Sequence, residues 1–146
     1  MNEKQLYTPA KSIYVGCGLT GAPTSFIESV ESLKTELKDE YEVFDFIGLT
    51  GGDNEDVYRW DIGHCVADCD MFVGVCDYPS IGLGWELAEA VRRGKPTLGV
   101  AHEKARVTRL VLGAAAVEST FRFERYNDLL KNVPVLIRSF EESSFM

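Results

Sequence analysis

The sequence predicts one α/β domain built on a five-stranded parallel sheet with helices on both of its faces. Short apolar runs alternate five times with segments whose apolar residues have helical spacing, which is typical of strands joined by crossover helices. The run Met71–Asp77 is almost entirely apolar, as expected for a strand that is covered on both faces. With 146 residues, of which 45% are hydrophobic, the chain fits a single domain over residues 1–146.

The predicted strands are short runs rich in β-branched and aromatic residues. The first, "SIYVGCG", ends in glycine, and the last, "TFRFERY", shows a visible alternation of apolar and polar residues. The five runs are Ser12–Gly18, Tyr41–Gly48, Met71–Asp77, Pro96–His102 and Thr120–Tyr126.

The segments between these runs are predicted helices. In Thr24–Glu40 the apolar side chains recur at helical spacing, and Ser25 and Glu28 have the spacing of a capping box at its start. Asn127–Phe140 also has a helical pattern, which Pro134 is expected to break or kink. The remaining helices are Asp56–Asp70, the segment that follows Pro79, and Arg106–Ala116.

Four loops are expected to carry the functional residues. Ligands of such folds bind beyond the carboxyl ends of the strands, near the point where the strand order reverses. The loops at that edge are Gly16–Thr24, Leu49–Glu55, Asp77–Gly84 and Ala101–Thr108.

Composition and charge exclude several function classes. The net charge of -8 and the pI of about 4.8 argue against a basic face for nucleic acid. A phosphorylated small molecule remains compatible, because backbone N–H groups and hydroxyls can bind a phosphate. The polar residues 1–11 are expected to be a flexible N-terminal segment without the apolar core of a signal peptide, and no apolar run is long enough for a membrane span. We therefore expect a cytoplasmic protein.

The cysteines and histidines do not form the pattern of a metal site. The four cysteines contain no CxxC pair, and the chain has only two histidines. We expect reduced, buried cysteines, no metal ion and no cofactor. The four cysteines are Cys17, Cys65, Cys69 and Cys76.

The glycine-rich stretch "GCGLTGAPTS" allows three interpretations. Gly16, Gly18 and Gly21 form part of a dinucleotide-binding fingerprint, for which Asp45 is the loosely placed acidic partner. The glycines can instead serve the backbone geometry of a turn, or allow the backbone to approach a ligand closely. The last interpretation makes Gly16, Gly18 and the neighbouring Thr20 candidate substrate-binding residues.

A second glycine-rich stretch, "PSIGLGWE", leads into a helix. Ser80 can cap this helix, and Gly82 and Gly84 leave space beside it. The partial positive charge of the helix start is expected to keep Glu86 ionised, so that its carboxylate can act as a nucleophile. The alternative is that Glu86 only complements the helix dipole.

Acidic and aromatic residues near the third strand add further candidates. A pair of carboxylates suits glycosidic chemistry, in which one attacks the anomeric carbon and one assists proton movement. Tyr14 and Trp85 can frame a nucleobase or a sugar, although packing in the core explains each of them as well. The acids are Asp61, Asp68, Asp70 and Asp77, and most acids at this density are simply solvated.

A family resemblance covers about Ser12 to Tyr126. The segments "SIYVGCGLTG" and "WDIGHCVADCDMFVGVCDYPSIGLGWELAEAVRRGKP" resemble the nucleoside 2-deoxyribosyltransferase superfamily, and within it the 2'-deoxynucleoside 5'-phosphate N-hydrolases. The resemblance implies a flavodoxin-like, Rossmann-like three-layer fold. It also implies cleavage of an N-glycosidic bond in a nucleoside or nucleotide.

The resemblance assigns roles to individual residues. Glu86 matches the catalytic glutamate that attacks C1' of the sugar, Asp61 the assisting aspartate, and Tyr14 the aromatic residue of the first strand. Ser80 matches the serine that contacts the 5'-phosphate. Thr108 matches a hydroxyl that a neighbouring subunit provides, so a homodimer or a larger homo-oligomer is expected.

The sequence departs from the N-hydrolase pattern in its first loop. Those enzymes carry a serine and an arginine where this chain has Gly18 and Thr20, which weakens the case for a phosphate. Ser80 instead favours a nucleotide as the substrate, because deoxyribosyltransferases often lack a serine at this position. The leading hypothesis is an N-glycosidase acting on a nucleoside 5'-monophosphate. The alternatives are a deoxyribosyltransferase and a non-catalytic nucleotide-binding module.

Overall fold

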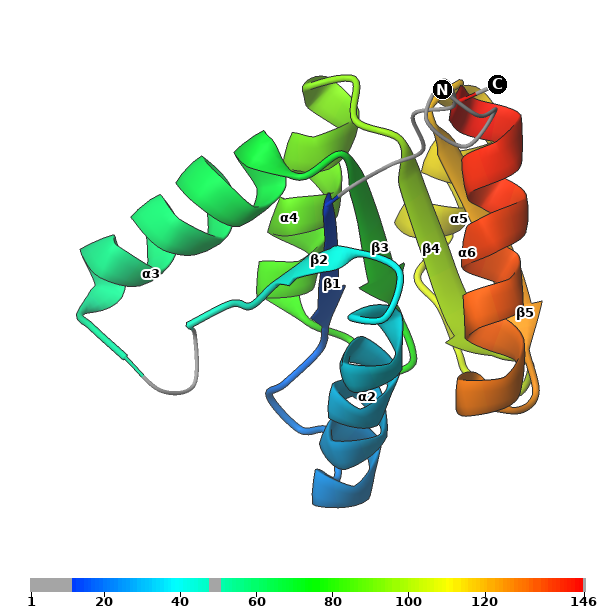
Figure 1. Ribbon diagram of the computed structural model, residues 1–146, viewed down its shortest axis with the longest axis horizontal. Coiled ribbons are helices and arrows are strands. Elements are labelled where there is room, and N and C mark those ends of the chain that lie inside the picture. Colours follow the sequence, from blue (N-terminus) through cyan, green and yellow to red (C-terminus); the bar gives the residue numbers. More distant parts are fainter. Residues whose placement is uncertain (1–11, 48–50, 146) are drawn as a thin grey trace, which may run out of the picture.

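The predicted parallel sheet is present in the computed structural model, which describes residues 12–47 and 51–145 (Figure 1). The sheet has the strand order β2-β1-β3-β4-β5, which is the flavodoxin-like order. Its strands are β1 (Ser12–Cys17), β2 (Glu42–Phe44), β3 (Met71–Val75), β4 (Thr97–His102) and β5 (Phe121–Tyr126). The predicted α/β fold class is therefore confirmed. The predicted flexible segment 1–11 lies outside the described residues.

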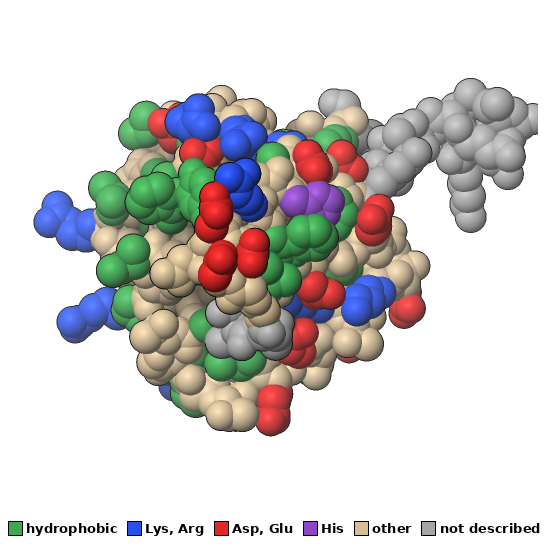
Figure 2. Space-filling view, turned by 90° about the vertical axis from the view of Figure 1, so that its left-hand side faces the viewer, with side chains coloured by type: hydrophobic (Ala, Val, Ile, Leu, Met, Phe, Trp, Pro, Cys, Tyr) green, Lys and Arg blue, Asp and Glu red, His purple; other side chains and the backbone are tan. Residues whose placement is uncertain are grey.

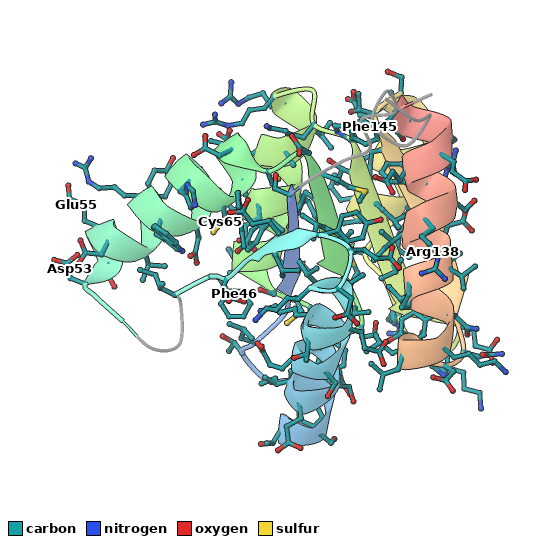
Figure 3. The ribbon with its side chains drawn as sticks, viewed as in Figure 1. Phe46, Asp53, Glu55, Cys65, Arg138 and Phe145 are labelled. Carbon is teal, nitrogen blue, oxygen red and sulfur yellow. The ribbon has the colours of Figure 1, made fainter. Side chains whose placement is uncertain are left out.

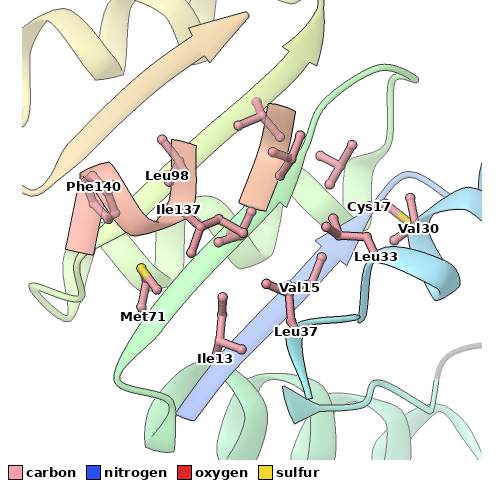
Figure 4. Packing of buried hydrophobic residues seen from close by; sticks show 14 of the residues in the cluster. Ile13, Val15, Cys17, Val30, Leu33, Leu37, Met71, Leu98, Ile137 and Phe140 are labelled. Carbon is pink, nitrogen blue, oxygen red and sulfur yellow. The ribbon is translucent and has the colours of Figure 1, made fainter. Parts of the chain in front are cut away.

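Helices cover both faces of the sheet and give it two separate cores. Helices α2 and α6 pack on one face, while η1, α4 and α5 pack on the other. Figure 4 shows the first core, where Leu33 and Leu37 of α2 lie beside Ile13 and Val15 of β1. The helices are α2 (Thr24–Leu37), α3 (Asn54–Trp60), the π-helix η1 (Asp61–Val66), α4 (Ile81–Arg92), α5 (Arg109–Val117) and α6 (Leu129–Phe145).

The strand order reverses between β1 and β3. The chain leaves β1 toward β2 on one side and returns to β3 on the other side, with Gly16 opposite Gly74 in the β1–β3 register. Crossovers that leave in opposite directions open a crevice beyond the carboxyl ends of the two central strands. The loops that follow β1 and β3 therefore meet there.

Several boundaries differ from the sequence-based expectations. The β2 strand is shorter than Tyr41–Gly48, and Gly48 lies outside the described residues. The capping box predicted for Ser25 and Glu28 is wrong, because α2 starts after Pro23 with no side-chain cap. A capping box occurs instead at α3, where Asp53 and Asp56 bond each other's backbone N–H groups.

Of the break or kink predicted at Pro134, the break does not occur. Helix α6 runs through it from Leu129 to Phe145. A proline inside a helix removes one backbone hydrogen bond. Val133, Ile137 and Phe140 are buried against the sheet on the same side of α6, and this burial offsets that loss.

The four cysteines are buried free thiols, as predicted. Burial raises the pKa of each of them, to about 11 for Cys17 and to about 12 for Cys65, Cys69 and Cys76. Within residues 12–47 and 51–145, no helix has the length and apolar character needed to cross a bilayer.

Candidate active site

A cavity of about 320 Å³ opens at the carboxyl ends of β1 and β3, and we call it the Glu86 pocket. It brings together six of the predicted site residues, from β1, the loop after it, η1 and the start of α4. These six are Tyr14, Thr20, Asp61, Ser80, Gly82 and Glu86. The crevice expected at the reversal point of the sheet therefore carries most of the candidate residues.

The buried Tyr14 and the partly buried Glu86 form a pair in this pocket. The Tyr14 hydroxyl donates a short hydrogen bond to Glu86 Oε2. The Tyr14 ring is buried and stacks on Phe72, with 5.2 Å between the ring centroids. A Cβ atom at Gly16 would lie 3.1 Å from Glu86 Oε1, so this glycine leaves room for the carboxylate. Tyr14 is thus held in the buried centre of the sheet, and Glu86 meets it from α4.

Burial dominates the charge state of Glu86. It raises the pKa of the Glu86 carboxyl to about 7, and the neighbouring Asp61 adds to the rise, whereas the hydrogen bond from Tyr14 opposes it. Burial, rather than the helix start that was expected to keep Glu86 ionised, therefore has the largest effect on this carboxyl. Glu86 lies beyond the first turn of α4, where the helix dipole has little effect. Burial and Glu86 also raise the pKa of Tyr14, so the phenol remains a donor.

Asp61 reaches the pocket from a π-helical segment. The sequence predicted one continuous helix over Asp56–Asp70, but the backbone changes from α3 to the π-helix η1 at Asp61. The Ala67 N–H bonds the carbonyl of Ile62, five residues earlier. Asp61 Oδ1 accepts the Ile47 N–H at 2.9 Å, and burial raises the pKa of the Asp61 carboxyl. The carboxyl group is thus held from the loop that follows β2.

The start of α4 supplies the polar end of the pocket. Ser80 is the predicted N-cap, and its Oγ accepts the Leu83 N–H at 3.1 Å. Gly82 and Thr20 line the pocket beside it. The first N–H groups of a helix have no partner within the helix and favour an anionic group. This end of the pocket can hold a phosphate or a hydroxyl.

Three predicted residues do not line the Glu86 pocket of this chain, and a fourth lies behind it. Gly18 packs against the loop after β3, where a Cβ atom would lie 2.5 Å from the Tyr78 carbonyl oxygen. Gly84 and Thr108 line a separate cavity of about 550 Å³ between α4 and α5, and Thr108 caps α5. Gly16 lies behind Glu86 rather than in the lining.

The other acids near β3 have structural partners outside the pocket. Asp68 pairs with His64, Asp70 accepts the Ser12 N–H, and Asp77 accepts the Tyr126 hydroxyl at 2.6 Å. Asp45, the proposed acidic partner of a dinucleotide fingerprint, forms an ion pair with Lys34. Of the four acids that bracket the strand, Asp61 is the one in the pocket lining.

The structure adds pocket residues that sequence reasoning missed. Trp85 was a candidate, but half of the other side chains come from the loop after β2 and from α3, whose relation to β1 depends on the fold. The additions are Cys17, Leu19, Phe46, Asn54, Val57, Tyr58, Ile62 and Leu83. Figure 3 shows Phe46 just beyond β2, beside α2. Acidic and hydrophobic side chains lie side by side on the molecular face seen in Figure 2. The hydrophobic residues among these additions give the Glu86 pocket an apolar, partly aromatic wall.

The arrangement combines two carboxyl groups with a fixed hydrogen-bond donor. One buried carboxylate can attack an electrophilic carbon, while a second carboxyl of raised pKa can give or take a proton. An apolar wall and a polar end suit a ligand with a flat ring at one end and a hydrophilic group at the other.

Comparison with known proteins places this chain in a family. No protein-family profile matches the chain. The chain is 31% identical over 118 residues, covering 80% of its length and 78% of the relative, to a protein of Syntrophotalea carbinolica named "Putative 2'-deoxynucleoside 5'-phosphate N-hydrolase 1".

Two solved structures share the fold. The CMP N-glycosidase BcmB of Clostridium botulinum superposes with a TM-score of 0.64 at 21% identity, over 87% of this chain and 99% of the other. A 2-deoxyribosyltransferase from Leishmania mexicana superposes with a TM-score of 0.61 at 12% identity, over 92% and 99%. The sequence relationship, the shared fold and the predicted resemblance agree. The chain belongs to the 2'-deoxynucleoside 5'-phosphate N-hydrolase family, an enzyme family within the nucleoside 2-deoxyribosyltransferase superfamily.

Proposed function

We propose that this enzyme cleaves the N-glycosidic bond of a (deoxy)nucleoside 5'-monophosphate, with Glu86 as the nucleophile, and releases the free base and the sugar phosphate. The observation that carries the proposal is the partly buried Glu86 carboxyl at the reversal point of the sheet, hydrogen-bonded to Tyr14 and sharing its pocket with Asp61. Family membership supports the class of reaction.

The reaction would proceed in two displacements. A Glu86 oxygen forms a bond to C1' while the bond from C1' to the base nitrogen breaks, and the Asp61 carboxyl donates a proton to the departing base. Asp61, now a carboxylate, then takes a proton from water as that water attacks C1' and releases Glu86. Tyr14 holds the attacking carboxylate in one orientation.

The polar end of the pocket would bind the 5' group of the substrate. Ser80, Gly82 and Thr20 lie at this end. Among the described lining residues there is no lysine or arginine, so hydroxyl and backbone N–H donors would hold the phosphate. Gly18 lets the first loop approach the loop that carries Ser80.

One incubation series tests the proposal against its alternatives. The enzyme is given deoxynucleosides and nucleoside monophosphates, each with and without a second free base. Sugar phosphate released regardless of the added base supports the hydrolase. A new nucleoside formed from the added base, with little free sugar, would identify a transferase, and binding without turnover would identify a nucleotide-binding module.

The pH dependence should report the ionisation of Glu86. Attack requires the Glu86 carboxylate, and a substrate whose leaving group departs without a proton, such as 4-nitrophenolate, does not also need Asp61 in its protonated form. With such a sugar phosphate, kcat/KM should fall as the pH drops below the Glu86 pKa of about 7. Below that value the decline should approach about tenfold for each pH unit. Tyr14→Phe removes a hydrogen bond that lowers this pKa, so its acid limb should move to higher pH. If the kcat/KM of the wild-type enzyme fell only near pH 4.5, the ordinary pKa of glutamate, this assignment would be contradicted.

Replacing Ser80 should separate phosphate binding from helix capping. Ser80→Ala should weaken nucleoside monophosphates selectively, by about 1.5–3 kcal/mol for a lost charged hydrogen bond. It should also lower the free energy of unfolding by about 1 kcal/mol, because α4 loses its N-cap. Isothermal titration and urea unfolding measure the two effects. Equal losses for nucleosides and nucleotides would mean that Ser80 is only a cap.

The enzyme should be a homodimer or a larger assembly. Across Arg109–Val117, all of which the structure describes, no residue of α5 is fully buried. Leu110 is 82% exposed, Val117 80%, and Ile81 of the adjacent α4 90%. Exposed apolar faces of this kind mark contacts between proteins. Light scattering at micromolar concentration measures the mass, and a monomeric mass would refute the expectation.

A further inference from the structure

Lys34 is a buried lysine behind the Glu86 pocket. It lies on α2, and its side chain is only 4% exposed. Its Nζ lies 3.0 Å from Glu31 Oε1 and 3.5 Å from Asp45 Oδ1. It also lies 4.1 Å from the centroid of the Phe46 ring. A buried ammonium is costly unless it is paired, and here its partners include the segment that follows β2.

That segment, Asp45–Ile47, connects Lys34 to the catalytic side of the molecule. The Asp45 carbonyl oxygen accepts the Trp60 indole N–H at 2.7 Å and the Cys65 thiol at 3.5 Å. Phe46 lines the Glu86 pocket, and the Ile47 N–H donates to Asp61 Oδ1. Three successive residues thus contact the lysine, the pocket and the carboxyl group that is proposed to move protons.

We propose that Lys34 is a positioning residue of the active site, whose buried ammonium fixes the Asp45–Ile47 segment and, through it, both the Phe46 wall and the Asp61 carboxyl. On this segment, Lys34 contacts the side chains of two consecutive residues, Asp45 and Phe46. Because Lys34 holds both side chains, the backbone of the segment is less free to rotate. The N–H group of the next residue, Ile47, therefore keeps its direction toward Asp61.

Lys34 also supplies the positive charge next to the two pocket carboxyls. It opposes the rise that burial causes in the pKa of Glu86 and of Asp61. The charged or titratable groups around it are Glu31 on α2, Asp45 after β2, Cys17 on β1, Asp61 on η1 and Glu86 on α4. Removing the ammonium should therefore shift the ionisation of Glu86 to higher pH as well as loosen the segment.

The test compares Lys34→Met with Lys34→Arg and with the control Lys38→Met. Lys38 is exposed at the end of the same helix. The readouts are kcat and KM on a nucleoside monophosphate, thermal unfolding, and a ¹³C NMR titration of the Glu86 carboxyl, assigned with Glu86→Gln. Lys34→Met should lower kcat/KM by about tenfold to a hundredfold and raise the Glu86 titration midpoint. Lys34→Arg should keep the midpoint near its wild-type value, and Lys38→Met should change nothing.

The effect on turnover rests on the proposed function, whereas the NMR titration does not, so failure of one is distinguishable from failure of the other. A folded Lys34→Met protein with the wild-type midpoint and wild-type kcat/KM would overturn the proposal. If Lys34→Met does not fold, Asp45→Asn and Phe46→Leu retain the lysine and each remove one of its contacts. Each should lower kcat/KM by about threefold to tenfold, and wild-type kinetics in both would overturn the proposal.

Discussion

Glu86→Gln should reduce the release of free base by about 10³-fold or more, while the protein stays folded and still binds the substrate. The amide cannot attack C1', so the loss falls on kcat rather than on affinity. The amide oxygen can still accept the hydrogen bond of Tyr14, and a neutral side chain suits this partly buried position. Single-turnover assays of base release, together with isothermal titration, measure the two quantities.

Two further variants make this result specific. Glu89→Gln changes the next acid along α4, which pairs with Arg92 and Arg93 away from the pocket lining, and it should retain wild-type kcat. Glu86→Ala should be as inactive as Glu86→Gln, and the space that it opens should let a small anion such as azide restore part of the turnover. Base release by Glu86→Gln or Glu86→Ala at a near wild-type rate would refute Glu86 as the nucleophile.

Asp61→Asn should lower kcat by about 10²–10⁴-fold, the usual contribution of a positioned acid–base group. The asparagine oxygen can still accept the Ile47 N–H, so the loop after β2 should keep its conformation. The loss should shrink for a sugar phosphate whose leaving group, such as 4-nitrophenolate, departs without a proton. Steady-state kinetics with both kinds of substrate measure the difference.

Asp68→Asn is the matched control for this variant. Asp68 lies further along the same helical stretch and pairs with His64, so its loss should leave kcat unchanged. If Asp61→Asn slows both kinds of substrate equally, Asp61 acts by shaping the pocket rather than by transferring a proton.

The fold was predictable because its signals are local. Buried parallel strands such as Met71–Val75 are continuous apolar runs, and the helices between them have the expected apolar spacing. The capping box predicted at Ser25 was wrong, since the same local pattern also occurs inside a helix. The predicted alternative of a helix break at Pro134 was wrong, because packing of α6 against the sheet overrides the local cost of a proline.

The candidate site was only partly predictable for a related reason. Two local sequence patterns, a glycine-rich helix start and the first strand, were recognisable and contain Glu86, Ser80 and Tyr14. The charge state of Glu86 was not predictable, because it depends on burial among residues that are distant in sequence. Phe46 and Lys34 were missed for the same reason, since each gains its place from contacts between α2 and the segment after β2.

The π-helix at Asp61–Val66 implies that the stability of this helix and the orientation of Asp61 cannot both be optimal. A π-helix places one more residue in each hydrogen-bonded turn than an α-helix does, and it is the less favourable backbone conformation. Losing one residue between Ile62 and Val66 would let the α-helix continue from α3, but it would rotate Asp61 about the helix axis relative to the buried Cys65. Selection for heat resistance alone would favour such a shortened helix. If Asp61 transfers protons as proposed, the resulting enzymes would be more stable and would have a lower kcat.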